Sequence, residues 1–107
     1  MIITTIRMTV PYEKRQEMLQ TVSTLTGTMR KERGCRACDF YIDTENSDAF
    51  LLIEEWETQD DFDRHVRNAA FSALLGMLTL LSRRTDVRIN AIADTAGMEK
   101  IKAVRAA

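Results

Sequence analysis

The sequence predicts an α+β fold in which one antiparallel sheet carries helices on a single face. Two patterns support this prediction. Some short segments alternate apolar and polar residues, which is typical of strands, and longer segments repeat apolar residues every three or four positions, which is typical of amphipathic helices. These segments follow one another in the order strand, helix, strand, strand, helix pair, strand. A short polar stretch between the second and third strands indicates a hairpin.

The first third of the chain predicts a strand, a helix and a second strand. Residues 2–10 are rich in β-branched side chains, and Ile6, Met8 and Val10 alternate with polar residues. Pro11 lacks a backbone N–H and ends the strand, and helical spacing follows over residues 12–31. Gly34 breaks this helix, and residues 35–43 predict the next strand. The apolar stripe of the helix consists of Met18, Val22, Leu25 and Met29.

The segment from residue 50 to residue 75 is the part around which the rest is organised. After a turn at 44–48, residues 50–57 predict a strand that is apolar on both faces and is therefore covered on both sides. Strand period puts Phe50, Leu52, Glu54 and Trp56 on one face and Leu51, Ile53 and Glu55 on the other. Thr58 and Asp61 form a capping box, so a helix should begin at about Gln59. On that helix His65, the single histidine, points inward toward the strand of Trp56.

The last third predicts a helix, a strand and a short helical tail. Residues 67–69 indicate a bend, and a second apolar helical stripe runs from Phe71 to Leu81. Residues 82–86 are polar and end it, and alternation over 87–93 predicts the fourth strand. Residues 98–105 form a helix with a weak apolar stripe that is too small to be stable alone. We expect this tail to dock on another surface.

The order of elements is that of a ferredoxin-like split β-α-β fold. Helices on one face of the sheet leave the other face uncovered, although the strands are apolar on both sides. A second copy that packs sheet to sheet would cover it, so the sequence predicts a homodimer.

Composition bounds the function. A chain of 107 residues is of single-domain size, and 15 basic against 16 acidic residues give a formal charge of −1. This balance produces no field that would hold a polyanion, so we expect no nucleic-acid partner. No segment approaches the ~20 apolar residues that a membrane helix needs. We therefore expect a soluble cytoplasmic protein without a membrane partner.

Cys35 and Cys38 form a CxxC motif, which invites a redox or zinc interpretation. A thioredoxin-type pair places its first cysteine at a helix N-terminus, whereas this pair leads into a strand, with the two side chains expected on opposite faces. A zinc site needs further ligands, and the sequence has no second CxxC and one histidine. We therefore predict no metal, no cofactor and no redox role, and two reduced thiols that suit the cytosol.

Three segments, GCRACDFYID, FLLIEEWETQDDFDRH and FSALL, resemble the antibiotic biosynthesis monooxygenase (ABM) family in order and spacing. The resemblance covers Met1 to about Ala93. It implies a dimeric α+β barrel with a site in the cleft between sheet and helices. It also implies an ABM-type domain over residues 1–94. The helical tail over 95–107 lies outside the resemblance, and its weak apolar stripe leads us to expect that it docks on the dimer partner. The family includes cofactor-independent oxygenases that use molecular oxygen on aromatic or quinol substrates, and relatives that degrade haem.

The haem-degrading branch of the family fits this sequence poorly. Its members have an asparagine at about the position of Ile6, a tryptophan at that of His65 and the haem-ligating histidine near Leu75. All three positions differ here, and without that histidine the cleft lacks a ligand for haem iron. Haem degradation is therefore the less favoured function.

The resemblance favours a cofactor-independent monooxygenase acting on a small aromatic or quinol. Such an enzyme needs a base, oxyanion donors and a dry pocket, because the deprotonated substrate itself reduces oxygen. His65 is the expected base or proton shuttle, since its ordinary pKa of ~6.5 is close to cellular pH. Glu55, or its neighbour Glu54, would orient the second ring nitrogen. The expected substrate contacts are Trp56, Tyr41, Phe62 and Phe71, which would sandwich a planar ring, and Arg7 and Asn90, which would contact oxygen.

Each of these residues also has a structural interpretation. A histidine on an apolar helical face is more often a packing residue, and Trp56 is more often part of a core. Glu54 and Glu55 would then pair with nearby arginines. The alternative function is therefore a non-catalytic small-molecule-binding or scaffold dimer of the same fold.

Overall fold

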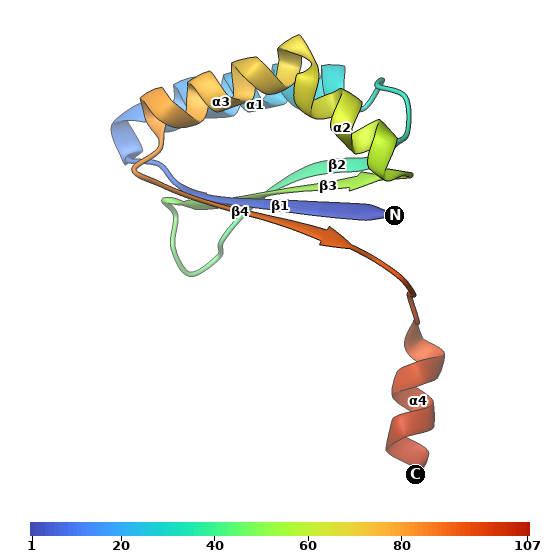
Figure 1. The fold of residues 1–107 in the computed structure, drawn as a ribbon. Coiled ribbons are helices and arrows are strands. Elements are labelled where there is room, and N and C mark those ends of the chain that lie inside the picture. The colour runs from blue at the N-terminus through green and yellow to red at the C-terminus, as the bar shows by residue number, and fades with distance from the viewer.

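The computed structural model describes all 107 residues and contains a four-stranded antiparallel sheet with helices on one face (Figure 1). The strands are β1 (Ile2–Thr9), β2 (Cys35–Ile42), β3 (Ala49–Trp56) and β4 (Arg84–Ala91). The helices are the 3₁₀ turn η1 (Tyr12–Lys14), α1 (Arg15–Met29), α2 (Gln59–Arg67), α3 (Ala69–Leu81) and α4 (Met98–Ala106). The strand order is β2-β3-β1-β4. This confirms the predicted α+β, ferredoxin-like fold.

Two element boundaries differ from the prediction. The first helix begins as a 3₁₀ turn and ends at Met29, and β4 begins at Arg84, three residues before the predicted start. Residues 84–86 are polar, yet Arg84 pairs with Thr9 across the neighbouring strand. Residues 84–86 therefore extend β4 although their local pattern indicates a turn. Pairing with β1 satisfies their backbone N–H and C=O groups whatever their side chains are.

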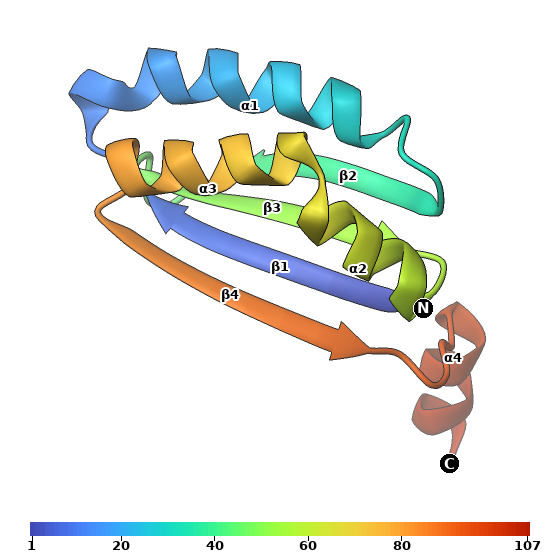
Figure 2. The same ribbon diagram turned by 45° about the horizontal axis from the view of Figure 1, so that its top comes forward.

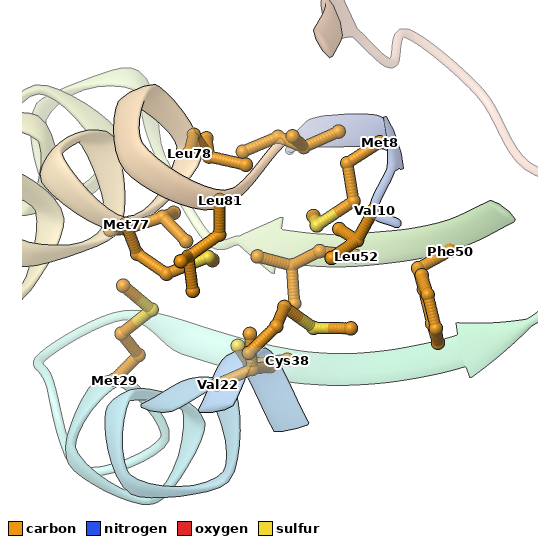
Figure 3. Packing of buried hydrophobic residues seen from close by; sticks show 13 residues of the cluster. Met8, Val10, Val22, Met29, Cys38, Phe50, Leu52, Met77, Leu78 and Leu81 are labelled. Carbon is orange, nitrogen blue, oxygen red and sulfur yellow. The ribbon is translucent and has the colours of Figure 1, made fainter. Parts of the chain in front are cut away.

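The main core lies between the sheet and the helices α1 and α3. Met18 of α1 and Leu52 of β3 are fully buried in it. Figure 3 shows Met29, Met77 and Leu81 on helices that face Leu52 and Cys38 on the sheet. The buried members are Ile6, Met8, Val10, Met18, Val22, Met29, Cys38, Phe50, Leu52, Leu74, Met77, Leu78 and Leu81. A smaller cluster of Ile2, Trp56 and Phe62 sits under α2, at the end of the sheet where His65 lies.

The two cysteines lie on the same face of β2, contrary to the prediction. Cys35 pairs with Trp56 and Cys38 with Glu54, with a bulge between Cys35 and Ala37. The extra residue shifts the side-chain alternation by one, so both thiols face the helices. Burial raises the pKa of Cys35 and raises that of Cys38 to about 12, so both thiols are poor nucleophiles.

The outer face of the sheet, opposite the helices, is uncovered in the single chain. Ile3, Leu51 and Ile53 are half-buried there, and Arg7 and Tyr41 are exposed. Helix α4 also lies on this side, beyond the end of β4 and away from the other helices (Figures 1 and 2). No helix in the structure combines the length and apolar character needed to cross a membrane.

Candidate active site

Helix α2 presents His65 to the sheet because its start is capped where the sequence predicts. The Thr58 hydroxyl accepts a hydrogen bond from the backbone N–H of Asp61 (3.1 Å), and acidic residues occupy the first turn. Asn68 has extended backbone and separates α2 from α3. The helix start at Gln59 and the inward direction of His65 follow from this cap.

His65 lies between two carboxylates and is 1% exposed. Its Nδ1 is 3.0 Å from Oε2 of Glu32 with hydrogen-bond geometry. Its Nε2 is 2.7 Å from Oε1 of Glu54, which is itself completely buried. That second contact is short, but the ring N–H is not aimed along a hydrogen bond to the oxygen, so we describe it as an ion pair.

Aromatic rings hold this pair in place. The Trp56 ring stacks on the imidazole with 4.2 Å between centroids and an interplanar angle of 25°, and its Nε1 donates to Oε1 of Glu54 over 3.1 Å. Phe71 meets His65 edge-on at 5.1 Å, and Phe62 lies at 6.4 Å. His65 and Glu54 are therefore fixed in position by packing as well as by charge.

Glu32 and Asn68 belong to the site, although nothing in the sequence singled them out. Glu32 lies in the connection between α1 and β2, and the Asn68 side-chain amide donates to its Oε1. Glu32 follows α1 by a few residues, and Asn68 lies between α2 and α3. Glu32 is more than 30 positions away in sequence from both His65 and Asn68. The one signal in the sequence was Gly34, which ends the predicted helix and indicates a tight turn beside Glu32. This signal does not indicate which residue Glu32 contacts.

The two carboxylates raise the pKa of His65 above its ordinary value. Burial is the largest single effect and lowers the pKa, because it disfavours the charged ring. The close contact and charge of Glu54, followed by the hydrogen bond and charge of Glu32, outweigh it. The imidazole therefore binds a proton more tightly than a histidine in water.

A mostly apolar pocket of about 310 Å³ adjoins this cluster, between α2, α3, β1 and β4. Thr4 and Glu54 are directly paired on adjacent strands, so their side chains share the face beneath α2. The Thr4 hydroxyl and Oε2 of Glu54 are both buried and have no hydrogen-bond partner. The lining residues are Thr4, Phe62, Asp63, Val66, Arg67, Phe71, Val87 and Ile89.

A buried oxygen without a hydrogen-bond partner destabilises the folded state by roughly 1–3 kcal/mol, and a bound ligand could supply that partner. Thr4 lines the pocket and Glu54 is its cross-strand neighbour, so a polar group on a bound molecule would be the partner that both lack. A larger hollow of about 540 Å³ lies on the outer face of the sheet. Its lining is mainly exposed strand residues and includes none of the side chains that pack on His65, whereas Phe62 and Phe71 of the smaller pocket do, so we assign the site to the smaller pocket.

Four of the predicted site residues lie on the outer face of the sheet, away from His65. Glu55 follows Glu54 in β3 and pairs with Ile3, so its side chain points outward, and Asn90 pairs with Ile3 from the other side. Arg7 and Tyr41 line the outer hollow. Alternation along a strand accounts for all four positions.

The remaining predicted residues lie at the site, in different roles. Phe62 and Phe71 line the pocket and contact His65. Trp56 is fully buried beneath His65 and does not line the pocket, so it supports the imidazole. The carboxylate beside the second ring nitrogen is Glu54, and the predicted Glu55 does not reach it.

The site does not form a metal centre. The imidazole of His65 separates Glu32 from Glu54, and each ring nitrogen faces one carboxylate, so the three groups do not converge on a common point. No group of three or more histidine, cysteine, aspartate or glutamate side chains in the structure could hold a metal ion.

The fold places the chain among the ferredoxin-like α+β proteins, and its buried carboxylate–histidine–carboxylate cluster lies beside a small apolar pocket. Within this class, residues 1–75 match the family described as antibiotic biosynthesis monooxygenase. The match spans well over half of the 107 residues, and the chain belongs to this family. The resemblance noted in the sequence is confirmed.

Solved structures share the fold. A protein from Methanosarcina mazei Go1 has 27% sequence identity and a TM-score of 0.79, with 83% of this chain and 89% of that chain covered. A Deinococcus radiodurans protein, provisionally assigned as an antibiotic biosynthesis monooxygenase, has 16% identity and a TM-score of 0.85, with coverages of 91% and 97%. At that identity the likeness concerns the fold alone.

A curated relative from Synechocystis, the uncharacterized protein sll1783, is 27% identical over 84 residues. The aligned part is 78% of this chain and 57% of the relative. The chain thus spans little more than half the length of that protein. Family membership supports a monooxygenase-like function in general terms.

Proposed function

We propose that the protein is a cofactor-independent monooxygenase that oxidises a small aromatic or quinol substrate with molecular oxygen. Its family membership supports oxygenase chemistry in general. The observation that carries the specific proposal is the buried Glu32–His65–Glu54 cluster beside a pocket lined by Thr4, with the Thr4 hydroxyl and Oε2 of Glu54 both unpartnered. The proposed catalytic pair is His65 with Glu54, in place of the predicted Glu55.

The pocket has the size and chemistry for a compact ring. A volume of about 310 Å³ is at the lower end of the range for small-molecule sites. Phe62 and Phe71 line it and offer their rings to a planar substrate. The Thr4 hydroxyl would hydrogen-bond a substrate oxygen, which would satisfy its missing partner.

The proton would leave the substrate through Glu54. Its Oε2 is free to accept from a substrate hydroxyl, while its other oxygen faces Nε2 of His65 at 2.7 Å. Neutral His65 would then take up the proton, since both carboxylates raise its pKa and so favour the imidazolium. Glu54 is placed first in this relay because its Oε2 lacks a partner and its cross-strand neighbour Thr4 lines the pocket.

Loss of this proton makes the substrate an electron donor. The resulting phenolate would reduce molecular oxygen, one oxygen atom would enter the ring and the other would leave as water. For a phenol the overall change is oxidation to a quinone, in which the substrate supplies all four electrons that oxygen takes up. Apolar walls would protect the reduced oxygen species from solvent.

We also propose that the protein works as a homodimer in the cytoplasm. The half-buried Ile3, Leu51 and Ile53 on the outer face of the sheet would be covered by a second copy. Both cysteines are free thiols, which fits a reducing compartment.

A non-catalytic small-molecule-binding or scaffold dimer is the alternative. The observation that favours it is the enclosure of His65 by Trp56, Phe62 and Phe71, which is also how a packing histidine is held. In that case the pocket would bind a ligand through Thr4 without turnover.

Oxygen uptake by purified, metal-free protein tests the proposal with a panel of quinols and hydroxylated aromatics. The variants are Glu54→Gln and His65→Gln, and Glu55→Gln is the matched control because it neutralises the adjacent carboxylate on the other face. We expect uptake above autoxidation that falls at least tenfold in the first two variants, about 1.4 kcal/mol of barrier, and stays unchanged in the control.

The pH dependence of uptake provides a second readout. Only neutral His65 can accept the proton, so the rate should rise as pH increases through the raised pKa of His65. Equal uptake in wild type, Glu54→Gln and His65→Gln would contradict the oxygenase mechanism. Ligand binding without uptake would then support the binding protein.

A further inference from the structure

Helix α4 has no partner within its own chain. Its apolar side chains Met98, Ile101 and Val104 are 61%, 54% and 62% exposed, and no residue of the helix is buried. The radius of gyration is 15.7 Å, whereas a compact domain of this length has about 13 Å. A nine-residue helix with a bare apolar side is unstable in water unless that side is covered.

The chain sends α4 away from its own pocket. Ala91 of β4 pairs with Ile2, and the backbone N–H of Ile92 continues the ladder by donating to Met1 (2.8 Å). The connection that follows leads to the side of the sheet opposite α1 and α3 (Figures 1 and 2). The helix-side pocket of the same chain therefore lies across the sheet from α4.

The pocket carries its own bare apolar rim. Val66 of α2 and Val87 and Ile89 of β4 line it, and they are 38%, 47% and 56% exposed. Helix α3 packs on α1, so no helix covers the side of β4 that faces the pocket. The pocket rim and α4 thus each expose three apolar side chains, which could cover one another on contact.

We propose that α4 of a second copy of this chain packs across the open side of the pocket, so that each site is completed by its partner. Two sheets packed face to face lie about 10 Å apart, and nine helical residues extend about 13.5 Å. A helix that descends from one sheet is therefore long enough to pass the edge of the partner sheet and reach the partner's helix layer.

Charge favours the same partner. Helix α4 carries Lys100, Lys102 and Arg105 against a single acidic residue, and Asp63 of α2 lines the pocket. Arg67 also lines the pocket and would repel the basic residues of α4, so the attraction is partial. The docked helix would remove Met98, Ile101 and Val104 from water and exclude water from the pocket. The inference depends on the proposed homodimer and on the location of the pocket, and it holds whether the pocket serves catalysis or binding alone.

Cysteine cross-linking in the full-length protein tests this arrangement. Ile101→Cys would be combined with Ile89→Cys, and the control pair would combine Ile101→Cys with Leu80→Cys, an exposed α3 residue outside the pocket. On mild oxidation we expect a covalent dimer from the first pair, at least fivefold more than from the control pair. Single variants measure the background from Cys35 and Cys38. A disulfide confined within one chain, or equal dimer from both pairs, would overturn the proposal.

A second measurement does not depend on disulfide geometry. Sedimentation equilibrium would compare the dissociation constant of the dimer for wild type, Ile101→Glu and Leu80→Glu. We expect Ile101→Glu to raise it at least tenfold and Leu80→Glu to leave it unchanged, because only Ile101 enters the interface. An unchanged constant in Ile101→Glu would overturn the exchange of α4. Neither experiment measures oxygen uptake, so their failure is distinct from failure of the proposed function.

Discussion

At His65 two carboxylates offset the cost of burying a protonated imidazole. A protonated imidazole that is 1% exposed and has no partner would strongly destabilise the fold. Here Glu32 and Glu54 contact its two nitrogens at 3.0 and 2.7 Å. Removing either carboxylate would leave the ring with one partner and the full cost of burial. The protonation of His65 is therefore a direct report on both contacts.

Nuclear magnetic resonance can follow this residue without assignment, because the chain has one histidine. We expect the titration midpoint of wild-type His65 to lie above ~6.5 and to fall in Glu54→Gln and in Glu32→Gln, since each removes a neighbouring negative charge. Glu55→Gln should leave it unchanged. A wild-type midpoint below 6.5 would show that burial outweighs the carboxylates.

The two elements that carry the site meet at a single glycine. Gly34 has φ of +81°, a conformation that side chains rarely adopt, and ends the connection that bears Glu32. A Cβ at this position would lie 2.2 Å from the Asp61 carboxyl, which is held by Thr58 and by Arg64 (2.9 Å) at the start of α2. The α1–β2 connection and α2 can approach this closely only because residue 34 has no side chain.

Gly34→Ala should therefore destabilise the protein by about 2 kcal/mol or more, through backbone strain and the clash with Asp61. Gly27→Ala is the matched control, because Gly27 lies inside α1 with nothing within 4 Å of an added Cβ. It should stabilise by up to about 1 kcal/mol. Urea unfolding of both variants measures the difference, and equal stabilities would refute the close approach.

At the scale of the whole molecule, the raised pKa of His65 links stability to pH. A group whose pKa is higher in the folded state stabilises fully below its unfolded pKa of ~6.5, and this contribution is lost as pH rises through the folded pKa. The free energy of unfolding should thus fall from pH 6 upward. Burial of the Cys38 thiol, with a pKa raised from 9.0 to about 12, continues the fall above pH 9.

Urea unfolding at about pH 6, 7.5, 9 and 10.5 measures this decline. His65→Gln should lose the part of the slope that begins near pH 6.5 and keep the part above pH 9. A wild-type protein that becomes more stable between pH 6 and 8 would contradict a raised pKa.

The sequence by itself predicts the fold because the fold depends on periodicities that lie within single segments. The alternation of Ile6 and Met8, the cap at Thr58 and the stripe around Met18 each need only near neighbours. The same strand period already separates Glu54 from Glu55, and applying it to the inward direction of His65 identifies Glu54 as the partner.

Tertiary structure alone decided the rest of the site. Glu32 reaches His65 and Asn68 across more than 30 positions, and a polar residue in a connection has no pattern that predicts such partners. The bulge that turns Cys35 inward is likewise a property of the pairing of β2 with β3. Local side-chain patterns determine which segments form helices and strands, whereas packing between distant segments determines which polar groups meet and how strongly each binds a proton.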